Sequence, residues 1–571
     1  MKKLLLIFVA LLGIAVLATV AGILMSRQGR GTRGRGATVL VWKVDGPVLE
    51  QEVPRLPFSG AAEPDSIAQL YPAFRAARED STVKGLAVYV QNAELGLAKA
   101  QELRRQMLAL KRAGKFVECY LETAGEGSNG TLAYYLATAC ERIHLSPAGD
   151  LNLLGLSWES RLLRGTLDKL KIDPQFNRVG RYKSAVETYT QSRLTPEAQE
   201  AIAALLDGYY AQIVSAVAEA RGKSQAEVRE LVDGAPYDAE TARQRGLVDD
   251  LAYPDQFLEL LKKRLGGRKP KLLPIEEYRP EPVFASRQIA VVFALGTIVR
   301  GGGGTAPWTE ETFLGSDRMA EVLHDLREDD AVAAVVLRID SPGGSALASD
   351  LILRQVEKLR QKKPVVVSMS DTAASGGYYI AARASKIVAE PATLTGSIGV
   401  FGGKFVTRRF EEEILGIGHD SQKRGANADL YSELQPYSPR QEAQVQQLMD
   451  RTYAAFVGHV AAGRRMSREA VEGVASGRVW TGAAASRIGL VDALGGLDQA
   501  LELARSEARI GPRETVAVDF YPAPRTWLDV FFAKREPRLP GALAAVVKGL
   551  ETNPPRLLEL PPELARLSRP F

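Results

Sequence analysis

Apolar and polar positions alternate along most of the chain in the manner of an α/β protein. Short apolar segments such as 83–90 and 116–121 predict buried strands, and amphipathic stretches such as 67–78 predict helices between them. Strands joined through helices of ten or more residues form βαβ units with right-handed crossovers, so we expect parallel sheets.

One apolar segment, residues 4–25, has no charged residue and predicts a membrane anchor. At about 1.5 Å per residue, a helix of this length crosses a bilayer core of about 30 Å. A cleaved signal peptide is the alternative, but such peptides usually have a shorter apolar stretch, and the small-residue site at 19–21 is weak. Lysines precede the segment and arginines follow it, so charge does not decide its orientation.

The chain contains the same unit twice. Residues 83–90 resemble 332–339 at an offset of 249, and residues 134–137 resemble 378–381 at an offset of 244. The offset changes because the first copy has five extra residues, which we place within 125–130. A repeat of this βαβ kind predicts two tandem α/β domains.

The repeat and the connecting segments predict how the chain is organised. It comprises a transmembrane anchor at 4–25, a linker at 26–44, an N-terminal α/β domain at 45–270, a C-terminal α/β domain at 285–515 and a tail at 516–571. The stretch 265–283 is rich in Lys, Arg and Pro and separates the domains. The tail is rich in proline, and no fold is assigned to it.

Composition narrows the functional classes. Hydrophobic residues make up 46% of the chain and charged residues 25%, as in a globular protein, and the formal charge is only +5. This balance gives little support to nucleic-acid binding. Cys119 and Cys140 have no metal-binding spacing, and we expect two buried thiols, with a disulfide as the alternative. No metal or organic cofactor is implied.

Candidate catalytic residues lie at the ends of two predicted strands in the second copy. One strand leads into Ser341-Pro342-Gly343-Gly344, and the next leads into Ser375-Gly376-Gly377 and a helix. A serine at such a junction lies beside free backbone amides and the positive end of the helix dipole. The N–H of Gly376, with one from Gly343 or Gly344, would form an oxyanion hole. A helix cap is the alternative role for Ser375.

No histidine is an evident base for Ser375. The four histidines lie in a predicted strand, in helices or in a loop without a catalytic motif, and structural roles are expected for all of them: His144, His324, His419 and His459. A buried lysine is the other candidate. Lowering its pKa from about 10.4 to about 7 costs about 4–5 kcal/mol, so it needs an apolar pocket and a hydrogen-bond partner. Ala373 replaces the first glycine of G-x-S-x-G, which argues against an α/β-hydrolase.

Four motifs together resemble signal peptide peptidase A in its long, internally duplicated form. They are Ser341-Pro342-Gly343-Gly344, Ala373-Ala374-Ser375-Gly376-Gly377-Tyr378, Leu394-Thr395-Gly396-Ser397-Ile398-Gly399 and Gly180-Arg181-Tyr182-Lys183-Ser184-Ala185-Val186-Glu187. The resemblance covers roughly residues 40–515. It implies a crotonase/Clp-protease-like fold in both domains, with Ser375 as nucleophile, Lys183 as general base and Ser397 as a residue that holds the lysine amine.

The resemblance also implies an activity, an assembly and a location. The activity is that of a serine endopeptidase, which cuts cleaved signal peptides at small or apolar side chains through an acyl-enzyme. The assembly is a homotetramer that encloses several active sites. The location is the bacterial cytoplasmic membrane, with a single pass and the catalytic part on the outer, periplasmic side.

The repeat supports one serine–lysine pair per chain. The first copy has Thr131 at the position of Ser375 and lacks the glycine loop. The position of Lys183 falls near Asn427 or Ala428 in the second copy, and Lys423 is about four residues early. Each copy lacks what the other retains, so we expect one site at the junction of the two domains.

Two other interpretations stay open. A non-catalytic membrane scaffold fits the lost site of the first copy, but it leaves the glycine loops around Ser375 without a purpose. A crotonase-type acyl-CoA enzyme has a related fold, but it has no use for the anchor or for the serine–lysine pairing.

Overall fold

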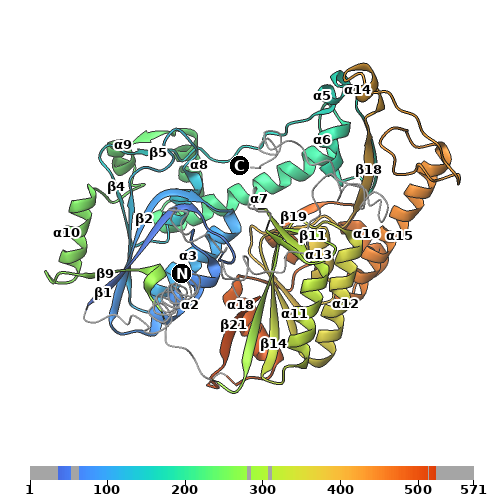
Figure 1. The fold of residues 1–571 in the computed structure, drawn as a ribbon. Helices are drawn as coiled ribbons and strands as arrows, with labels where there is room; N and C mark the ends of the chain where they lie inside the picture. The colour runs from blue at the N-terminus through green and yellow to red at the C-terminus, as the bar shows by residue number, and fades with distance from the viewer. Residues whose placement is uncertain (1–36, 53–63, 280–284, 306–310, 512, 523–571) are drawn as a thin grey trace, which may run out of the picture.

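The computed structural model describes residues 37–52, 64–279, 285–305, 311–511 and 513–522. They form two α/β halves that lie side by side, coloured blue to green and yellow to red in Figure 1. The predicted anchor at 4–25 lies outside the described residues.

The first half is built on a parallel sheet of six strands in the order β8-β4-β3-β2-β1-β9. The strands are β1 (Thr38–Pro47), β2 (Val83–Glu94), β3 (Phe116–Leu121), β4 (Arg142–Leu145), β8 (Asp250–Leu251) and β9 (Lys271–Pro274). Its helices include α2 (Ile67–Glu79), α3 (Leu97–Arg112), α4 (Thr131–Ala137), α8 (Gln225–Asp233), α9 (Ala239–Gln244) and α10 (Pro254–Arg264). Every residue of β3 is buried, which explains its nearly continuous apolar sequence.

The second half repeats this arrangement, because its strands β20, β16, β15, β14, β10 and β21 follow one another in the same order. Their bounds are β10 (Gln288–Leu295), β14 (Val332–Ser341), β15 (Val365–Ala374), β16 (Lys386–Ala389), β20 (Ala493–Leu494) and β21 (Ala517–Tyr521). The helices are α11 (Ser316–Glu328), α12 (Ala346–Lys362), α13 (Gly376–Ala381), α15 (Pro439–Arg464), α16 (Arg468–Val474), α17 (Gly482–Arg487) and α18 (Leu497–Glu507). The predicted pair of tandem α/β units is therefore confirmed.

Shorter strands surround these two sheets. In the second half, β17 (Leu394–Gly396) pairs with β15 and with β19 (Val479–Thr481). A separate small sheet of the second half contains β11 (Thr297–Val299), β12 (Gly303–Thr305) and β13 (Thr312–Gly315). In the first half, β5 (Asp150–Leu151) pairs with β7 (Tyr237–Asp238).

Three strands of the main sheets lie wholly or partly outside the domain limits expected from the sequence. Strand β1 begins at Thr38, within the stretch 26–44 that was expected to be a linker. Strand β9 lies within 265–283 and pairs with β1, and β21 lies in the tail and pairs with β10. Both β9 and β21 are short strands at a sheet edge, so they carry little of the periodicity that marks a strand.

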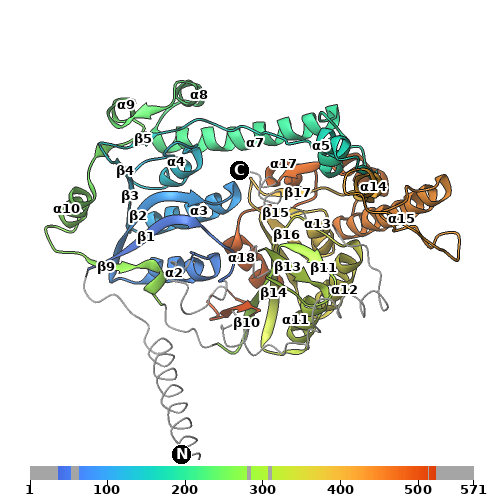
Figure 2. The same ribbon diagram turned by 45° about the horizontal axis from the view of Figure 1, so that its top comes forward.

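The first half reaches over the second through an arm and a long helix. In the arm, β6 (Asp173–Val179) pairs antiparallel with β18 (Val400–Val406) of the second half. Short helices accompany them: α5 (Arg164–Lys169), η1 (Ser184–Val186), α6 (Glu187–Thr190) and α14 (Arg408–Glu413). Helix α7 (Pro196–Arg221) runs above both halves in Figure 2 and contacts β19.

By length and composition, α7 is the one helix among the described residues that could cross a membrane. Its buried side chains Ile213, Val214 and Val217 belong to the main hydrophobic core of the protein. We therefore describe α7 as a bridging helix of the folded part.

A buried ion network joins the halves at their junction. Arg338 of β14 is fully buried and donates hydrogen bonds to Glu50 at 2.8 and 3.1 Å and to Glu102 at 2.6 Å. Both carboxylates belong to the first half, and both are buried as well. Because an unpaired buried charge costs several kcal/mol, this network strongly favours one relative placement of the halves.

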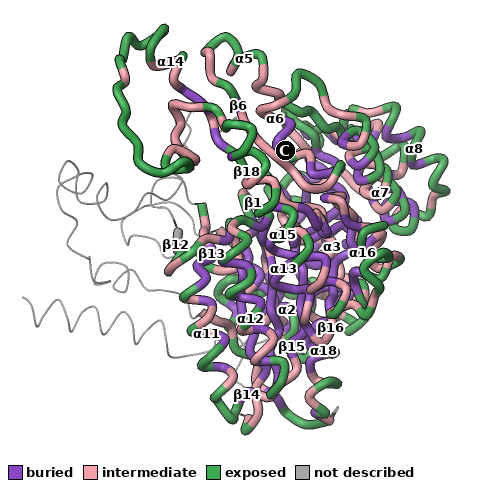
Figure 3. The backbone as a smooth tube through the Cα atoms, turned by 90° about the vertical axis from the view of Figure 1, so that its right-hand side faces the viewer, coloured by how far each residue is buried: buried purple, intermediate pink, exposed green. Residues whose placement is uncertain are grey.

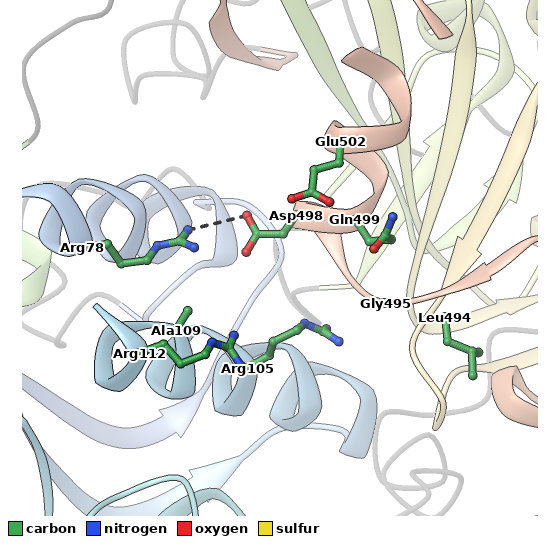
Figure 4. Close-up of a pocket in the computed structure, with 9 residues that line it drawn as sticks. All are labelled: Arg78, Arg105, Ala109, Arg112, Leu494, Gly495, Asp498, Gln499 and Glu502. Carbon is green, nitrogen blue, oxygen red and sulfur yellow. Dashed lines mark ion pairs between the residues drawn. The ribbon is translucent and has the colours of Figure 1, made fainter. Parts of the chain in front are cut away.

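A polar cleft of about 280 Å³ lies beside this network, between helices of the two halves (Figure 4). Arg78 of α2 and Arg105 and Arg112 of α3 line one side, and Asp498 and Glu502 of α18 line the other. Arg78 pairs with Asp498 at 3.7 Å. The charges on the two sides are opposite in sign, so the cleft is part of the same polar junction.

The two cysteines form a disulfide between Cys119 and Cys140, so the expectation of two buried thiols is wrong. Cys119 lies in β3, and Cys140 lies just after α4. Their Cα atoms are 5.8 Å apart, which is within the range that a disulfide spans. The cysteines are 21 residues apart in the sequence, and only the return of the chain beside β3 brings them together.

We predict that Cys119→Ala/Cys140→Ala lowers the free energy of unfolding by about 3 kcal/mol, because the disulfide restricts a loop of moderate length in the unfolded chain. Urea denaturation of the oxidised protein and of the variant measures the difference. Reduced wild-type protein is the control and should behave like the variant. Two titratable thiols in denatured, unreduced wild-type protein would contradict the disulfide.

Candidate active site

Ser375 lies at the sharp turn between β15 and α13. Its φ is +52°, a left-handed conformation that is unusual for a serine. Its N–H donates to the carbonyl oxygen of Gly396 at 2.9 Å. The side chain makes no capping hydrogen bond to α13, so Ser375 does not act as a helix cap. Its hydroxyl is therefore available to other groups at the end of the strand.

Lys183 reaches this turn from the first half, where it follows β6 at the start of η1. The side chain is buried, with 4% of the residue exposed. Its Nζ lies 2.9 Å from Ser375 Oγ, 2.9 Å from Ser397 Oγ and 3.0 Å from the carbonyl oxygen of Ser397. The structure thus brings together the three residues that the sequence singled out as nucleophile, base and orienting group.

The three contacts of the Lys183 amine match the hydrogen-bonding capacity of its neutral form. A neutral amine donates two hydrogen bonds and accepts one through its lone pair. The carbonyl oxygen of Ser397 can only accept, and Ser397 Oγ can accept the second hydrogen. In the neutral form the lone pair is then left for the hydroxyl of Ser375, which can donate its proton toward Nζ. This arrangement is the one needed to remove that proton.

Burial lowers the pKa of Lys183 to about 8. Among the described residues, no carboxylate forms an ion pair with its amine. The acidic residue nearest in the sequence, Glu187, accepts from Arg178 at 2.8 Å and from the hydroxyl of Thr195 at 2.7 Å. Because the charged form has no negative partner, the neutral form becomes accessible close to neutral pH.

Two glycine loops meet beside Ser375 through bare backbone. A Cβ added to Gly343 would lie 2.5 Å from the nitrogen of Gly376, and one added to Gly377 would lie 2.5 Å from the carbonyl oxygen of Ser341. Gly343 also has a φ of +103°, which glycine adopts without steric cost. Side chains at these positions would push the loops apart.

The hydrogen bonds of these loops distinguish the three glycines proposed as oxyanion donors. The N–H of Gly343 donates to Ser341 Oγ at 3.2 Å. For the N–H groups of Gly344 and Gly376, no acceptor is found within the described part of the chain. Gly376 is the first residue of α13, where the helix supplies none. Gly344 and Gly376 are therefore the amides available to an anionic oxygen.

A turn at 476–478, which the sequence analysis missed, connects the lysine to the rest of the site. Tyr182 N–H donates to the carbonyl oxygen of Ser476 at 2.9 Å, and Ser397 N–H donates to that of Arg478 at 2.8 Å. A Cβ added to Gly477 would lie 2.6 Å from the backbone nitrogen of Lys183. A serine–glycine pair marks a turn in the sequence, but nothing there places this turn against Lys183.

The histidines lie in other surroundings. Each one contacts a charged side chain: His144 with Glu118 at 3.2 Å, His324 with Arg327 at 2.7 Å, His419 with Glu411 at 2.8 Å and His459 with Asp350 at 3.5 Å. No contact between a histidine and Ser375 or Lys183 is present in the described chain.

A serine on a strained strand-to-helix turn, in contact with a buried lysine amine and beside free amides, defines a serine hydrolase with a lysine base. The sequence profile of peptidase family S49 matches residues 114–267 and 357–511, one segment in each half. The chain belongs to this family and is a serine peptidase. Each half contributes one parallel-sheet α/β unit.

The full-length relatives agree with this assignment. The chain is 34% identical over 506 residues to "Serine protease SPPA, chloroplastic" of Arabidopsis thaliana, which covers 87% of this chain and 73% of the relative. It is 33% identical over 474 residues to "Protease 4" of Haemophilus influenzae, with 78% and 73% covered. It is 32% identical over 491 residues to "Protease 4" of Salmonella typhi, with 83% and 76% covered. The resemblance to the long, duplicated signal peptide peptidase A is therefore confirmed.

The low pKa of Lys183 predicts that activity rises with pH. Only the neutral amine can accept the proton of Ser375, so kcat/KM should increase about tenfold per pH unit below pH 8 and level off above it. A fluorogenic peptide assayed between pH 6 and pH 10 measures this profile. Lys404→Met is the matched control, because Lys404 is another buried lysine whose pKa burial lowers, and its loss should not move the midpoint. A flat profile from pH 7 to pH 9 would show that Lys183 is not the titrating base.

Proposed function

We propose that the chain is a membrane-anchored endopeptidase that degrades cleaved signal peptides through Ser375 and Lys183. The 2.9 Å contact between Ser375 Oγ and Lys183 Nζ carries this proposal. In acylation, the neutral amine takes the serine proton as Oγ attacks the peptide carbonyl, and the resulting ammonium protonates the leaving amine. In deacylation, the amine takes a proton from the water that attacks the acyl ester.

Backbone amides stabilise the tetrahedral intermediates in this mechanism. The N–H groups of Gly344 and Gly376 donate to the oxyanion, and a donor of this kind typically contributes about 3–4 kcal/mol in the transition state. Gly343 shapes the loop, since its own N–H is engaged by Ser341. Ser397 orients the amine through its hydroxyl and its carbonyl oxygen, which fixes the lone pair toward Ser375.

The substrate class rests on the family and on the predicted anchor. Family membership implies peptide substrates, and the resemblance to signal peptide peptidase A narrows them to cleaved signal peptides. These peptides are apolar and stay in the membrane, where an enzyme anchored by residues 4–25 meets them. We therefore expect cleavage next to small or apolar side chains.

Ser375→Ala and Lys183→Ala should each abolish cleavage of a fluorogenic peptide while the fold stays intact, because each removes one half of the proton-transfer pair. Peptide cleavage and circular dichroism of the two variants test this. Lys404→Met is again the control and should cleave normally. Retained activity in either dyad variant would refute the assignment.

A serine-directed acylating probe separates the peptidase from a non-catalytic scaffold. The peptidase requires that wild-type protein is labelled and that Ser375→Ala is not. Absence of labelling in folded wild-type protein at pH 9, where Lys183 is mostly neutral, would favour the scaffold.

We place the catalytic halves on the outer side of the bacterial cytoplasmic membrane. The disulfide between Cys119 and Cys140 supports this placement, because such bonds form in the periplasm and are rare in the cytosol. The predicted anchor precedes both halves, so a single pass suffices to hold them at the membrane surface.

We also propose a closed homo-oligomer, with four subunits as the family resemblance implies. Helices α3 and α7 of the first half contact the second half, and two positions that are buried on them are exposed on the equivalent helices of the second half. Ala98 of α3 is 1% exposed, and its counterpart Leu347 of α12 is 54% exposed. Leu205 of α7 is 6% exposed, and its counterpart Leu448 of α15 is 51% exposed. A neighbouring subunit would cover the exposed faces in the same way, and repeated head-to-tail contacts of this kind form a ring when the rotation between subunits closes.

The arm supports the same arrangement. Strand β6 of the first half pairs with β18 of the second half, whereas their counterparts at 417–423 and 156–162 have no strand partner. Figure 3 shows the segment that follows α14 as mostly exposed. Large apolar side chains are exposed at or near both counterparts: Leu154, Leu156, Trp158, Ile414, Leu415 and Ile417. Two neighbouring subunits could pair these segments as β6 and β18 pair within one chain.

Leu347→Glu/Leu448→Glu should break the oligomer into smaller species, because the charges would be buried in the subunit contact without a partner. Analytical ultracentrifugation of the detergent-solubilised full chain measures its mass. Ala226→Glu on α8 is the control, since residue 226 and its counterpart Glu469 are both exposed. A monomeric wild-type protein, or an unchanged mass in the double variant, would contradict the proposed contact.

A further inference from the structure

Lys99 of the first half lies between the two strand ends that carry the catalytic loops. Its Nζ is 3.0 Å from Asp340, 3.4 Å from Asp371 and 3.8 Å from Glu50. Its backbone N–H also donates to Asp371 Oδ1 at 3.0 Å. Lys99 of α3 therefore contacts both Asp340 and Asp371 of the second half.

The two aspartates are the last charged residues before the catalytic loops. Asp340 directly precedes the loop that contains Gly343 and Gly344, and Asp371 lies four residues before Ser375. Asp340 Oδ1 also accepts from the N–H of Thr372 at 3.0 Å, so it links one loop to the other. The regular pairing of β14 with β15 is interrupted here, between Ile339 and Ser341. The aspartates and Lys99 thus fix the loops where the strand ladder does not.

The surroundings keep Lys99 charged, in contrast to Lys183. Burial alone would lower the pKa of Lys99, but Asp340, Asp371 and Glu50 outweigh burial and raise its pKa above the ordinary value. A permanent cation between carboxylates cannot act as a base. It can hold the carboxylates in place, because the buried Glu50 and the partly buried Asp340 and Asp371 would otherwise be poorly compensated charges.

The contact requires a close approach of the two halves and occurs once per chain. A Cβ added to Gly96, which precedes α3, would lie 2.2 Å from the carboxylate of Asp371. The counterparts of Lys99 and Asp340 in the other copy are Ala348 and Gln91, so the repeat has not preserved the arrangement. The arrangement lies at the strand ends of the half that carries Ser375.

We propose that Lys99 is a positioning residue, through which the first half holds the nucleophile loop and the oxyanion loop of the second half in register. The proposal rests on the proposed roles of Ser375, Gly344 and Gly376. The first half then contributes twice to the site, with Lys183 as the base and Lys99 as the clamp of the two loops.

Lys99→Met in the full chain tests this proposal. We expect kcat, measured per folded molecule, to fall at least about tenfold, because small displacements of reacting groups cost that much or more. KM should change far less, and the rate of labelling by a serine-directed acylating probe should fall in parallel with kcat. Lys111→Met is the matched control on the same helix, since its Nζ contacts the carbonyl oxygens of Ala139 and Cys140 within the first half. It should have wild-type kinetics.

Lys99→Met/Asp340→Asn separates positioning from simple stabilisation. The double variant removes one positive and one negative charge, so its thermal unfolding temperature should be higher than that of Lys99→Met. Its kcat can therefore be measured even where Lys99→Met alone does not fold. Because the clamp is still absent, its kcat should stay below that of wild type. A wild-type kcat per folded molecule in this double variant, or in Lys99→Met, would overturn the proposal.

The pH dependence gives a further readout. The activity of Lys99→Met relative to wild type should rise as the pH falls from 8 to 6, because protonation of a carboxylate relieves the repulsion that the variant exposes. The ionisable groups that face this cluster are Glu50, Glu102, Arg105, Tyr209, Arg338, Asp340 and Asp371. A ratio that is constant over this range would contradict the clamp. Loss of activity in Ser375→Ala with normal activity in Lys99→Met would refute the clamp alone, whereas activity in Ser375→Ala would refute the proposed function.

Discussion

The site depends on a buried amine that is held without a negative partner. Lys183 is a buried lysine and Lys99 a largely buried one; both belong to the first half, and both reach into the second half. Lys99 lies among carboxylates, which raise its pKa, whereas Lys183 meets only hydroxyl and carbonyl oxygens, and burial lowers its pKa to about 8. The difference arises from what surrounds each amine and not from how deeply it is buried. A single carboxylate beside Lys183 would keep it protonated and remove the base.

The duplication explains how one chain supplies both environments. The second half retains the strand-to-helix turn and the glycine loops, while the first half retains the lysine segment. In the first half, the position of Ser375 is taken by Thr131, whose Oγ accepts from the N–H of Gly155 at 3.0 Å. The hydroxyl that survives there is thus used to support the fold. The two copies of the unit together form one active site, to which one copy contributes the serine and glycine loops and the other contributes the lysine.

Much of this could be predicted from the sequence, because its signals are local. The strands of both sheets are short apolar runs, the repeat fixes their equivalence, and the motifs around Ser375 and Lys183 identify the candidate groups. What could not be predicted depends on contacts between distant segments. The disulfide requires the chain to return beside β3, and the turn at 476–478 has no feature that relates it to Lys183. The aspartates Asp340 and Asp371 stand in the sequence as ordinary strand ends, and only the packing of α3 against them gives them a partner.

Backbone strain shows why the site should exist only when the halves are docked. Three serines around Lys183 have positive φ values, +52° for Ser375, +51° for Ser397 and +53° for Ser476. Conformations of this kind cost about 1–3 kcal/mol each for a residue with a side chain, so the surroundings must hold them. Part of that support comes from the first half, since Tyr182 N–H donates to the carbonyl oxygen of Ser476 and Lys183 Nζ contacts both other serines. A separated second half would lose these contacts, and the turns could relax toward ordinary conformations. The junction therefore does more than bring a base to a nucleophile, because it also maintains the backbone geometry on which the nucleophile depends.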